Sequence, residues 1–389
     1  MPQVNDVETY PSGSRIIHIG PPKTGTTAVQ SALFRRQADL AAYGVAYPGR
    51  RRHERAAVSA AAFSWIPAGY PADIEKHWRR LTDEVRASTA GRVVVSSEIF
   101  ALAPDPRLPR IVEDLGGPGL QVVITTRPLA RMLPSQWQQS IQNREVVGYD
   151  EWLEQLFGPD AEPDPYTGSL WRQYRVDRLV QRWGAHVGEE NITVVVLDPE
   201  DRSMLLGTFE RLLGLPAGFL VPAPDENNLS LPYPEAEMLR AFNRRFRAEG
   251  HDHELYVRAI RRHAMRQVKA VGLPIMQACP VETPSWAVER ANEVAVEMAD
   301  AIRATGAQVI GDLAHLVTPV PGTEPREAPT RVAVDSAAEI AYAMFIAGRT
   351  AALARQRRQR RPAVEQVPAR DLARTLVGRA VRRMGVRRG

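Results

Sequence analysis

The stretch IIHIGPPKTGTT, residues 16–27, decides how the rest of the chain is interpreted. An apolar, β-branched run leads into Gly20 and Gly25, which are five positions apart as in a Walker-type phosphate loop. In such a loop a lysine directly follows the second glycine and reaches the terminal phosphates of a triphosphate. Here Thr26 holds that position, and the lysine, Lys23, lies between the glycines. The stretch therefore predicts a strand, a phosphate-binding loop and a helix, and it disfavours a magnesium-bound triphosphate.

An anion is the ligand that this loop is expected to hold. The glycines allow the backbone to turn tightly, so the N–H groups of Thr26, Thr27 and Ala28 should point toward a group bound at the helix N-terminus. Lys23 would then lie over an anhydride oxygen of a phosphate chain shorter than a triphosphate. The alternative is an ordinary glycine-rich turn, but paired glycines, a lysine and two threonines after a strand favour a phosphate site.

Strand-like runs alternate with helical stretches over the first part of the chain. Short β-branched runs, typical of buried parallel strands, cover residues 15–19, 92–97, 120–126 and 191–198. Helical stretches cover residues 27–40, 74–87, 129–143, 171–183 and 202–213. This alternation predicts an α/β fold, a three-layer sandwich with a mainly parallel sheet and ligands at the carboxyl ends of the strands. Residues 234–319 are predicted to be mostly helical and to pack on the sheet or cover the site.

Length and composition indicate one folded domain followed by a basic tail. The chain has 389 residues, 44% of them hydrophobic, which is enough to bury a full core. We expect a domain over 1–325, with an α/β core at about 15–215 and a helical part at about 230–320, and a helical, Arg-rich tail over 326–389. The single cysteine, Cys279, excludes an internal disulfide. Without a long apolar run or a recognisable signal peptide, the chain is expected to be cytoplasmic.

The positive charge is concentrated near the C-terminus. Residues 351–389 contain 12 Arg and 2 acidic residues, a net charge of +10, so of the overall +5 the preceding 350 residues carry −5. A body without this charge argues against a nucleic-acid binder. The tail can collect apolar side chains on one helical face, namely Leu372, Leu376, Ala380 and Met384. Such a segment suits an anionic membrane surface or an acidic partner, and a solvated extension is the alternative.

A second motif follows the strand predicted at 120–126. In VVITTRPLARMLPSQWQQSI, residues 122–141, Arg127 ends the strand and Ser135 comes eight residues later on the predicted helix. Together with GPPKTGTT after a strand, this pair resembles the sulfotransferases that use 3′-phosphoadenosine 5′-phosphosulfate (PAPS). It is most similar to the branch of carbohydrate sulfotransferases and their bacterial relatives, and the resemblance covers about residues 15–240.

The resemblance implies a donor and the residues that hold it. PAPS would be the cofactor and PAP its product, and no metal would be required. The 5′-phosphosulfate would be bound by the loop residues Pro22, Lys23, Thr24, Gly25, Thr26 and Thr27, and the 3′-phosphate by Arg127 and Ser135. Neither motif identifies the acceptor. A carbohydrate hydroxyl follows from the family branch, and a small-molecule hydroxyl is the competing expectation.

Two side chains are the first candidates for catalysis. By analogy with phosphoryl transfer, Lys23 would stabilise the negative charge that builds on the leaving phosphate. Glu98 directly follows a predicted strand and is the first candidate for the base that takes the acceptor's proton, with capping of the next turn as its alternative role. Other candidates for the base are His53, His251 and His253. His18, inside the first strand, is expected to be a core residue.

Two other functions are weighed against this one. A small-molecule kinase on the same P-loop scaffold would require magnesium ligands and a lysine placed for a γ-phosphate, and the loop favours neither. A non-catalytic, membrane-recruited module could keep the fold without turnover. The joint presence of Lys23, Arg127 and Ser135 argues instead for a working site.

Overall fold

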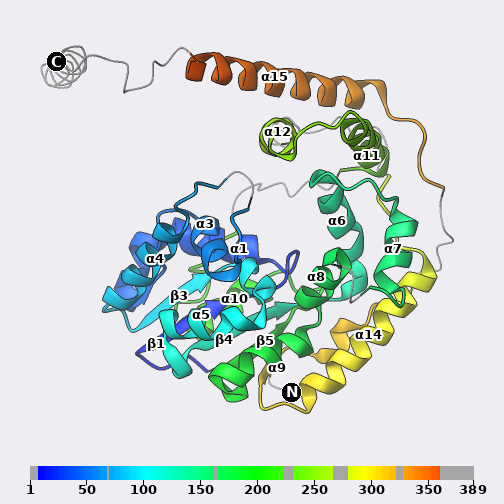
Figure 1. Ribbon diagram of the computed structural model, residues 1–389. Helices are drawn as coiled ribbons and strands as arrows, with labels where there is room; N and C mark the ends of the chain where they lie inside the picture. The colour runs from blue at the N-terminus through cyan, green and yellow to red at the C-terminus, as the bar shows by residue number, and fades with distance from the viewer. Residues whose placement is uncertain are drawn as a thin grey trace, which may run out of the picture.

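A parallel sheet forms the centre of the molecule (Figure 1). The structure is a computed structural model, and it describes residues 8–67, 70–161, 165–222, 231–265, 279–320 and 327–359. The six strands have the order β2-β3-β1-β4-β5-β6, and every neighbouring pair is parallel. They are β1 Ser14–His18, β2 Val45–Ala46, β3 Arg92–Ser96, β4 Gln121–Thr126, β5 Ile192–Val196 and β6 Gln308–Ile310. The predicted α/β class with a mainly parallel sheet is confirmed.

Helices cover both faces of this sheet. Ile17 of β1 lies opposite Val95 of β3 and Val122 of β4, and these side chains pack into one core. Its helices include α3 Arg55–Ala62, α4 Glu75–Ala87, α5 Leu108–Leu115 and α9 Val176–Val187. Neighbouring strand residues such as Ile16 and Val94 point the other way, because side chains alternate along a strand. They pack against α1 Thr26–Arg35, α2 Gln37–Leu40 and α10 Met204–Leu213, which completes three layers.

A second core is built from helices alone. Its members are α6 Leu129–Gln142, α7 Tyr149–Phe157, α8 Pro165–Tyr174, α11 Tyr233–Ala248, α12 His253–Tyr256, the π-helix η7 Val257–Ala264, α14 Ser285–Arg303 and α15 Val334–Gln359. Large aromatic side chains fill it, with Trp137 and Trp152 fully buried and the ring of Tyr233 edge-on to Trp137.

Within the described part of the chain, no helix has both the length and the apolar character needed to cross a membrane.

The predicted strands and helices are present, but two helices are interrupted and some elements, among them the short strands β2 and β6, were not predicted. The helices predicted over 27–40 and 171–183 are each interrupted, at Arg36 and Arg175, where ψ values of 11° and 81° leave the helical region. The segment 234–319, predicted mostly helical, also contributes β6, which pairs with β5. A strand of three residues is too short to show a β-branched pattern, so sequence periodicity does not reveal it.

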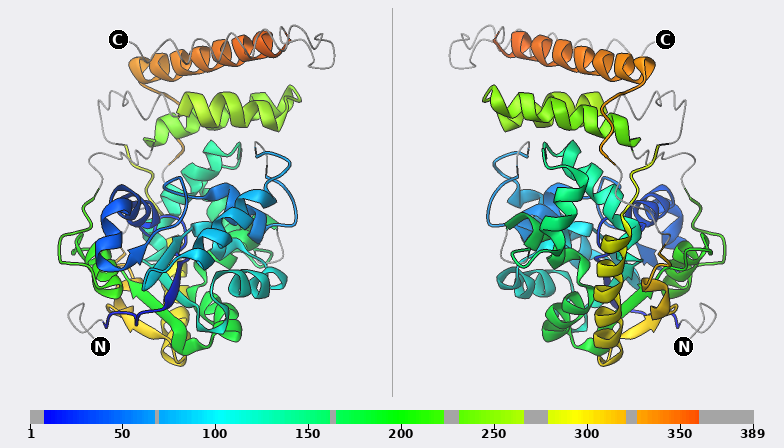
Figure 2. Two further views of the ribbon diagram at one scale, coloured as in Figure 1. Left: turned by 90° about the vertical axis from the view of Figure 1, so that its left-hand side faces the viewer. Right: turned by 90° about the vertical axis from the view of Figure 1, so that its right-hand side faces the viewer.

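The C-terminal helix α15 packs on the body of the protein. Ile340, Ala343 and Ala347 are buried in the helical core, and the helix contacts η7. Figures 1 and 2 show α15 at the periphery, beyond α11 and α12. The predicted helical tail is thus a helix up to Gln359. Residues 360–389, with the apolar face predicted there, lie outside the described residues, and the division into domain and tail stays a prediction.

Candidate functional site

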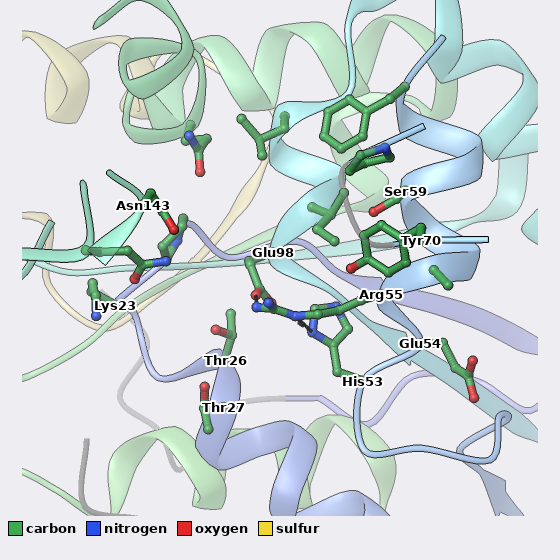
Figure 3. A pocket seen from close by; sticks show the side chains of 18 of the residues that line it. Lys23, Thr26, Thr27, His53, Glu54, Arg55, Ser59, Tyr70, Glu98 and Asn143 are labelled. Atoms are coloured by element: carbon green, nitrogen blue, oxygen red, sulfur yellow. Dashed lines mark hydrogen bonds and ion pairs between the residues drawn. The ribbon is translucent and has the colours of Figure 1, made fainter. Parts of the chain in front are cut away.

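A large cavity lies at the carboxyl ends of the central strands (Figure 3). Its volume is about 1770 Å³. Because β3, β1 and β4 are parallel neighbours, the residues that follow them meet at one edge of the sheet. The cavity wall therefore brings together side chains predicted from distant parts of the sequence, namely Pro22, Lys23, Thr26, Thr27, Glu98, Arg127 and Ser135.

The loop after β1 depends on its two glycines. A Cβ on Gly20 would lie 2.0 Å from the Thr125 hydroxyl oxygen, so only glycine fits beside β4. Gly25 is the N-cap of α1 with a φ of 85°, a conformation that favours glycine, and Lys23 has a φ of 73°. The backbone thus has a positive φ at two positions of the loop and turns sharply before the helix. This turn leaves the N-terminus of α1 exposed to the cavity.

The loop presents fewer groups to the cavity than the sequence suggests. The Ala28 N–H donates to the Gly25 carbonyl at 2.9 Å, so the expectation that it points at a ligand is wrong. Thr26 and Thr27 provide the first two amides of the helix, which have no carbonyl one turn earlier to bond. Thr24 is fully buried and does not line the cavity; its hydroxyl donates to the Pro21 carbonyl at 2.7 Å. Thr24 therefore stabilises the conformation of the loop from its buried side.

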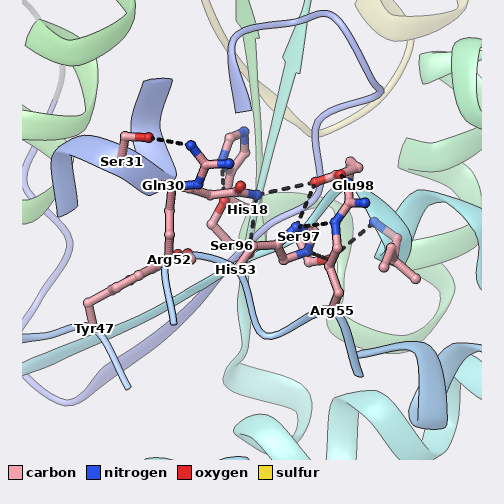
Figure 4. A network of polar contacts seen from close by, with 11 residues as sticks. His18, Gln30, Ser31, Tyr47, Arg52, His53, Arg55, Ser96, Ser97 and Glu98 are labelled. Carbon is pink, nitrogen blue, oxygen red and sulfur yellow. Dashed lines mark hydrogen bonds and ion pairs between the residues drawn. The ribbon is translucent and has the colours of Figure 1, made fainter. Parts of the chain in front are cut away.

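A buried polar network fixes the loop to the sheet, and Figure 4 shows its members His18 and Ser96 near Glu98. His18 bonds through Nδ1 to the Ser96 hydroxyl at 2.9 Å and through Nε2 to the Thr125 hydroxyl at 3.0 Å. The Thr24 hydroxyl completes the chain at 2.9 Å from Thr125 Oγ1. Burial lowers the pKa of His18 to about 3, against the opposing effect of Glu98, so the imidazole is neutral. His18 is the core residue that its place in the strand predicts.

The second predicted anion site adjoins the loop. Arg127 directly follows β4, and its Nη1 donates to the Lys23 carbonyl at 3.3 Å. Ser135 is one to two turns into α6 and lines the same cavity. Burial and the neighbouring Arg131 lower the pKa of Arg127, but a guanidinium stays charged in proteins. A fixed cation therefore lies next to the loop, and a hydroxyl lines the same cavity.

Glu98 faces the cavity from the end of β3 (Figure 3). Arg55 Nη2 donates to Oε1 at 2.6 Å, and Gln30 Nε2 donates to Oε2 at 3.2 Å. Burial tends to raise the pKa of Glu98, but His53, Arg55 and the hydrogen bonds outweigh it and lower the pKa below the ordinary value. The capping of the next turn is done by Ser97, whose hydroxyl accepts from the Ile99 N–H at 3.2 Å.

His53 is the histidine closest to Glu98. Its Nδ1 lies 3.6 Å from Glu98 Oε2 and accepts a hydrogen bond from Arg55 Nε at 3.1 Å. Because Nδ1 is an acceptor, the proton of the neutral ring is on Nε2, which donates to the Ser97 hydroxyl at 2.7 Å. Burial lowers the pKa of His53 to about 4, which keeps the ring neutral near pH 7. Sequence reasoning placed His53 in a basic loop and did not foresee this contact.

The two histidines of the HDHEL segment separate. His253 lines the cavity, where burial lowers its pKa, with Arg144 and Arg261 acting in the same direction. His251 is not part of the lining and packs on the ring of Phe246, with centroids 5.0 Å apart. Across the residues that the structure describes, no three His, Cys, Asp or Glu side chains gather as metal ligands would.

One wall of the cavity was missed by sequence reasoning. Phe63 and Trp65 stack with their ring centroids 5.2 Å apart, and both line the cavity together with Tyr70. Arg50 and Arg51 lie on the same side, in the basic loop before α3. The aromatic spacing in FSWIP, residues 63–67, was the available signal, but it has no helical or strand period.

Comparisons with known proteins add little to this geometry. No protein-family model matches the sequence, and no curated protein matches it either. Among solved structures, the chain is similar to the crystal structure of a sulfotransferase from Alicyclobacillus acidocaldarius, with 16% sequence identity and a TM-score of 0.36. The match covers 63% of this chain and 99% of that chain. A likeness this distant says nothing about function, so the proposal below depends on the residues of the cavity.

Proposed function

We propose that this protein is a sulfotransferase that moves a sulfuryl group from PAPS to an acceptor hydroxyl. One observation carries the proposal: Arg127 contacts the loop of Lys23, and both line one cavity together with Ser135. Lys23 and the first turn of α1 form one site, and Arg127 and Ser135 form the other. PAPS carries a phosphosulfate at the 5′ position and a phosphate at the 3′ position of one ribose. Two adjacent sites match that spacing of charge better than the single extended chain of a triphosphate.

The loop would stabilise the leaving group. When bound, PAPS would supply the sulfuryl group, which joins the acceptor oxygen as the bond between sulfur and the 5′-phosphate oxygen breaks. The bond electrons stay on that phosphate oxygen. The Lys23 ammonium and the amides of Thr26 and Thr27 would offset this charge, because they are positioned donors at a helix N-terminus. The products would be PAP, a sulfate ester and one proton.

Glu98 would take the acceptor's proton. Its lowered pKa keeps the carboxylate ionised near neutral pH, although the same shift makes it a weaker base. Arg55 and Gln30 each occupy one lone pair, and a carboxylate has others to offer to a hydroxyl. The neutral ring of His53 is the alternative base, but both of its nitrogens already have partners.

A carbohydrate is the acceptor that we propose. The cavity exceeds the roughly 300–1,000 Å³ of a pocket for one small ligand, so it has room for a donor and a sizeable acceptor. The stacked rings of Phe63 and Trp65 offer an apolar surface for the C–H face of a sugar. A small-molecule hydroxyl is the competing acceptor, and a screen of both classes with labelled PAPS distinguishes them.

The donor site can be tested without knowing the acceptor. At a hundredfold excess over Kd, PAP should stabilise the protein by about 2.7 kcal/mol, seen as a higher melting temperature without added magnesium. Adenosine 5′-phosphate should do far less, because it lacks the 3′-phosphate. The Arg127→Gln variant should lose most of the preference for PAP over adenosine 5′-phosphate. Stabilisation by magnesium ATP and none by PAP would support a kinase and refute the proposal.

A further inference from the structure

The helix α15 has apolar side chains on two opposite sides. One side is buried on the helical core through Ile340, Ala343 and Ala347. On the other side Phe345 is 63% exposed and Tyr342 is 58% exposed, in the same stripe as Val334 and Leu353. Successive spacings of eight, three and eight residues place these four side chains, which we call the outer face, along one side of the helix.

Nothing in the described part of the chain covers the outer face. Figures 1 and 2 show α15 at the edge of the molecule, with α11 and α12 on its inner side only. Single exposed apolar residues are normal on a protein surface, but a continuous aromatic and aliphatic stripe marks an interaction site. The outer face is therefore available to a partner, as far as the described residues show.

The charge around the outer face indicates which partner it is. Arg349 is exposed and occupies the same stripe, between Phe345 and Leu353. The sequence then continues with the arginines of residues 351–389, whose net charge is +10. Aromatic and aliphatic side chains next to clustered arginines are typical of helices that lie in the interface of an anionic membrane.

We propose that the outer face of α15, together with the exposed Arg349, binds an anionic lipid bilayer surface. A second copy of the chain is the alternative occupant, and it would have to bring two segments of net charge +10 into one assembly. The contact would place the cavity near the bilayer, since α15 packs on η7 and η7 contributes Val257 and Arg261 to the cavity lining. Binding would thus hold the enzyme where membrane-linked hydroxyl acceptors are.

Vesicle sedimentation with the full-length protein tests this proposal. The protein should bind vesicles of phosphatidylglycerol and phosphatidylcholine in equal parts, and should not bind phosphatidylcholine alone. The double variant Tyr342→Ser/Phe345→Ser should bind the anionic vesicles about tenfold more weakly or worse, because it removes the two largest apolar side chains of the outer face. Substituting Arg349 by glutamine should also weaken binding and reduce its sensitivity to salt.

A matched control separates the outer face from general surface effects. Val296→Ser changes an exposed apolar residue on α14 and should leave vesicle binding unchanged. All variants should keep the wild-type melting temperature, because the altered side chains are exposed. Absence of binding to anionic vesicles by the unaltered protein would overturn the proposal. So would equal binding by the Tyr342→Ser/Phe345→Ser variant, or a stable dimer in light scattering that this variant abolishes.

Discussion

Replacing Glu98 by glutamine distinguishes a base from a residue that only shapes the site. The substitution keeps the size of the side chain and its ability to accept hydrogen bonds, but an amide cannot take a proton from the acceptor. Turnover should therefore fall by about 10² to 10⁴. PAP affinity should change little, because Glu98 follows β3 whereas the proposed phosphate contacts follow β1 and β4.

The structural cost of this substitution should be small. Glu98 loses its ion pair with Arg55, whose side chain is 50% exposed, and such a half-exposed pair contributes at most about 1 kcal/mol. The Gln30 amide can still donate to the new amide oxygen. We expect the free energy of unfolding to fall by about 1 kcal/mol, too little to explain a large loss of turnover.

The assay needs an acceptor from the screen with labelled PAPS. Turnover is measured for the wild type, for Glu98→Gln and for Asp105→Asn, which also removes a carboxylate from a pair with an arginine, Arg182, but outside the cavity. The control should turn over normally. Normal turnover by Glu98→Gln would refute the role of Glu98 as base and move the same test to His53 and His253. A large loss of PAP affinity would instead mean that Glu98 shapes the donor site.

Three further predictions concern the loop and the pH dependence. Lys23→Ala should lower turnover by about 10² to 10³ and also weaken PAP binding in the thermal shift, unlike Glu98→Gln. Gly20→Ala should lower the free energy of unfolding in urea by roughly 2 to 4 kcal/mol, because its Cβ would displace the buried Thr125 hydroxyl. The open helical position Gly207 should accept alanine without loss. If Glu98 is the base, kcat/KM should stay constant on acidification until the pH falls through its lowered pKa, which lies below the ordinary pKa of a glutamate, whereas a limb near 6.5 would indicate an unperturbed histidine.

Much of the fold could be predicted because its strands are fully buried. The runs around Ile17, Val94 and Ile124 are covered by helices on both faces, and a parallel strand in that setting is a continuous apolar run. The strand β6 and the breaks at Arg36 and Arg175 could not be predicted in the same way. They depend on tertiary contacts and on single backbone angles, which leave no period in the sequence.

The candidate site also combines features that the sequence predicts with features that it does not. The loop around Lys23 and the pair of Arg127 and Ser135 are local patterns, and the parallel sheet brings them to one edge. The contact of Arg55 with Glu98 joins residues 43 positions apart through side chains alone. Arg55 begins α3, whereas Glu98 follows β3, and the helix α4 lies between them in the sequence. No sequence spacing predicts such a contact, so the surroundings of Glu98 could be known only from the structure.

The helix α1 connects the donor site to the proposed base. Its N-terminus is part of the proposed anion site. Gln30, one turn after Thr26, donates both to Glu98 Oε2 and to the Ser96 carbonyl at 3.4 Å. The hydrogen bonds of His18, Thr125 and Thr24 stabilise the buried side of the loop. Because His18 is neutral, this network adds no charge next to the phosphate groups of the proposed donor. Hydrogen bonds therefore link the loop, the helix and Glu98. The aromatic and basic wall at residues 50–70 belongs to other elements, so acceptor preference can change there without disturbing donor binding.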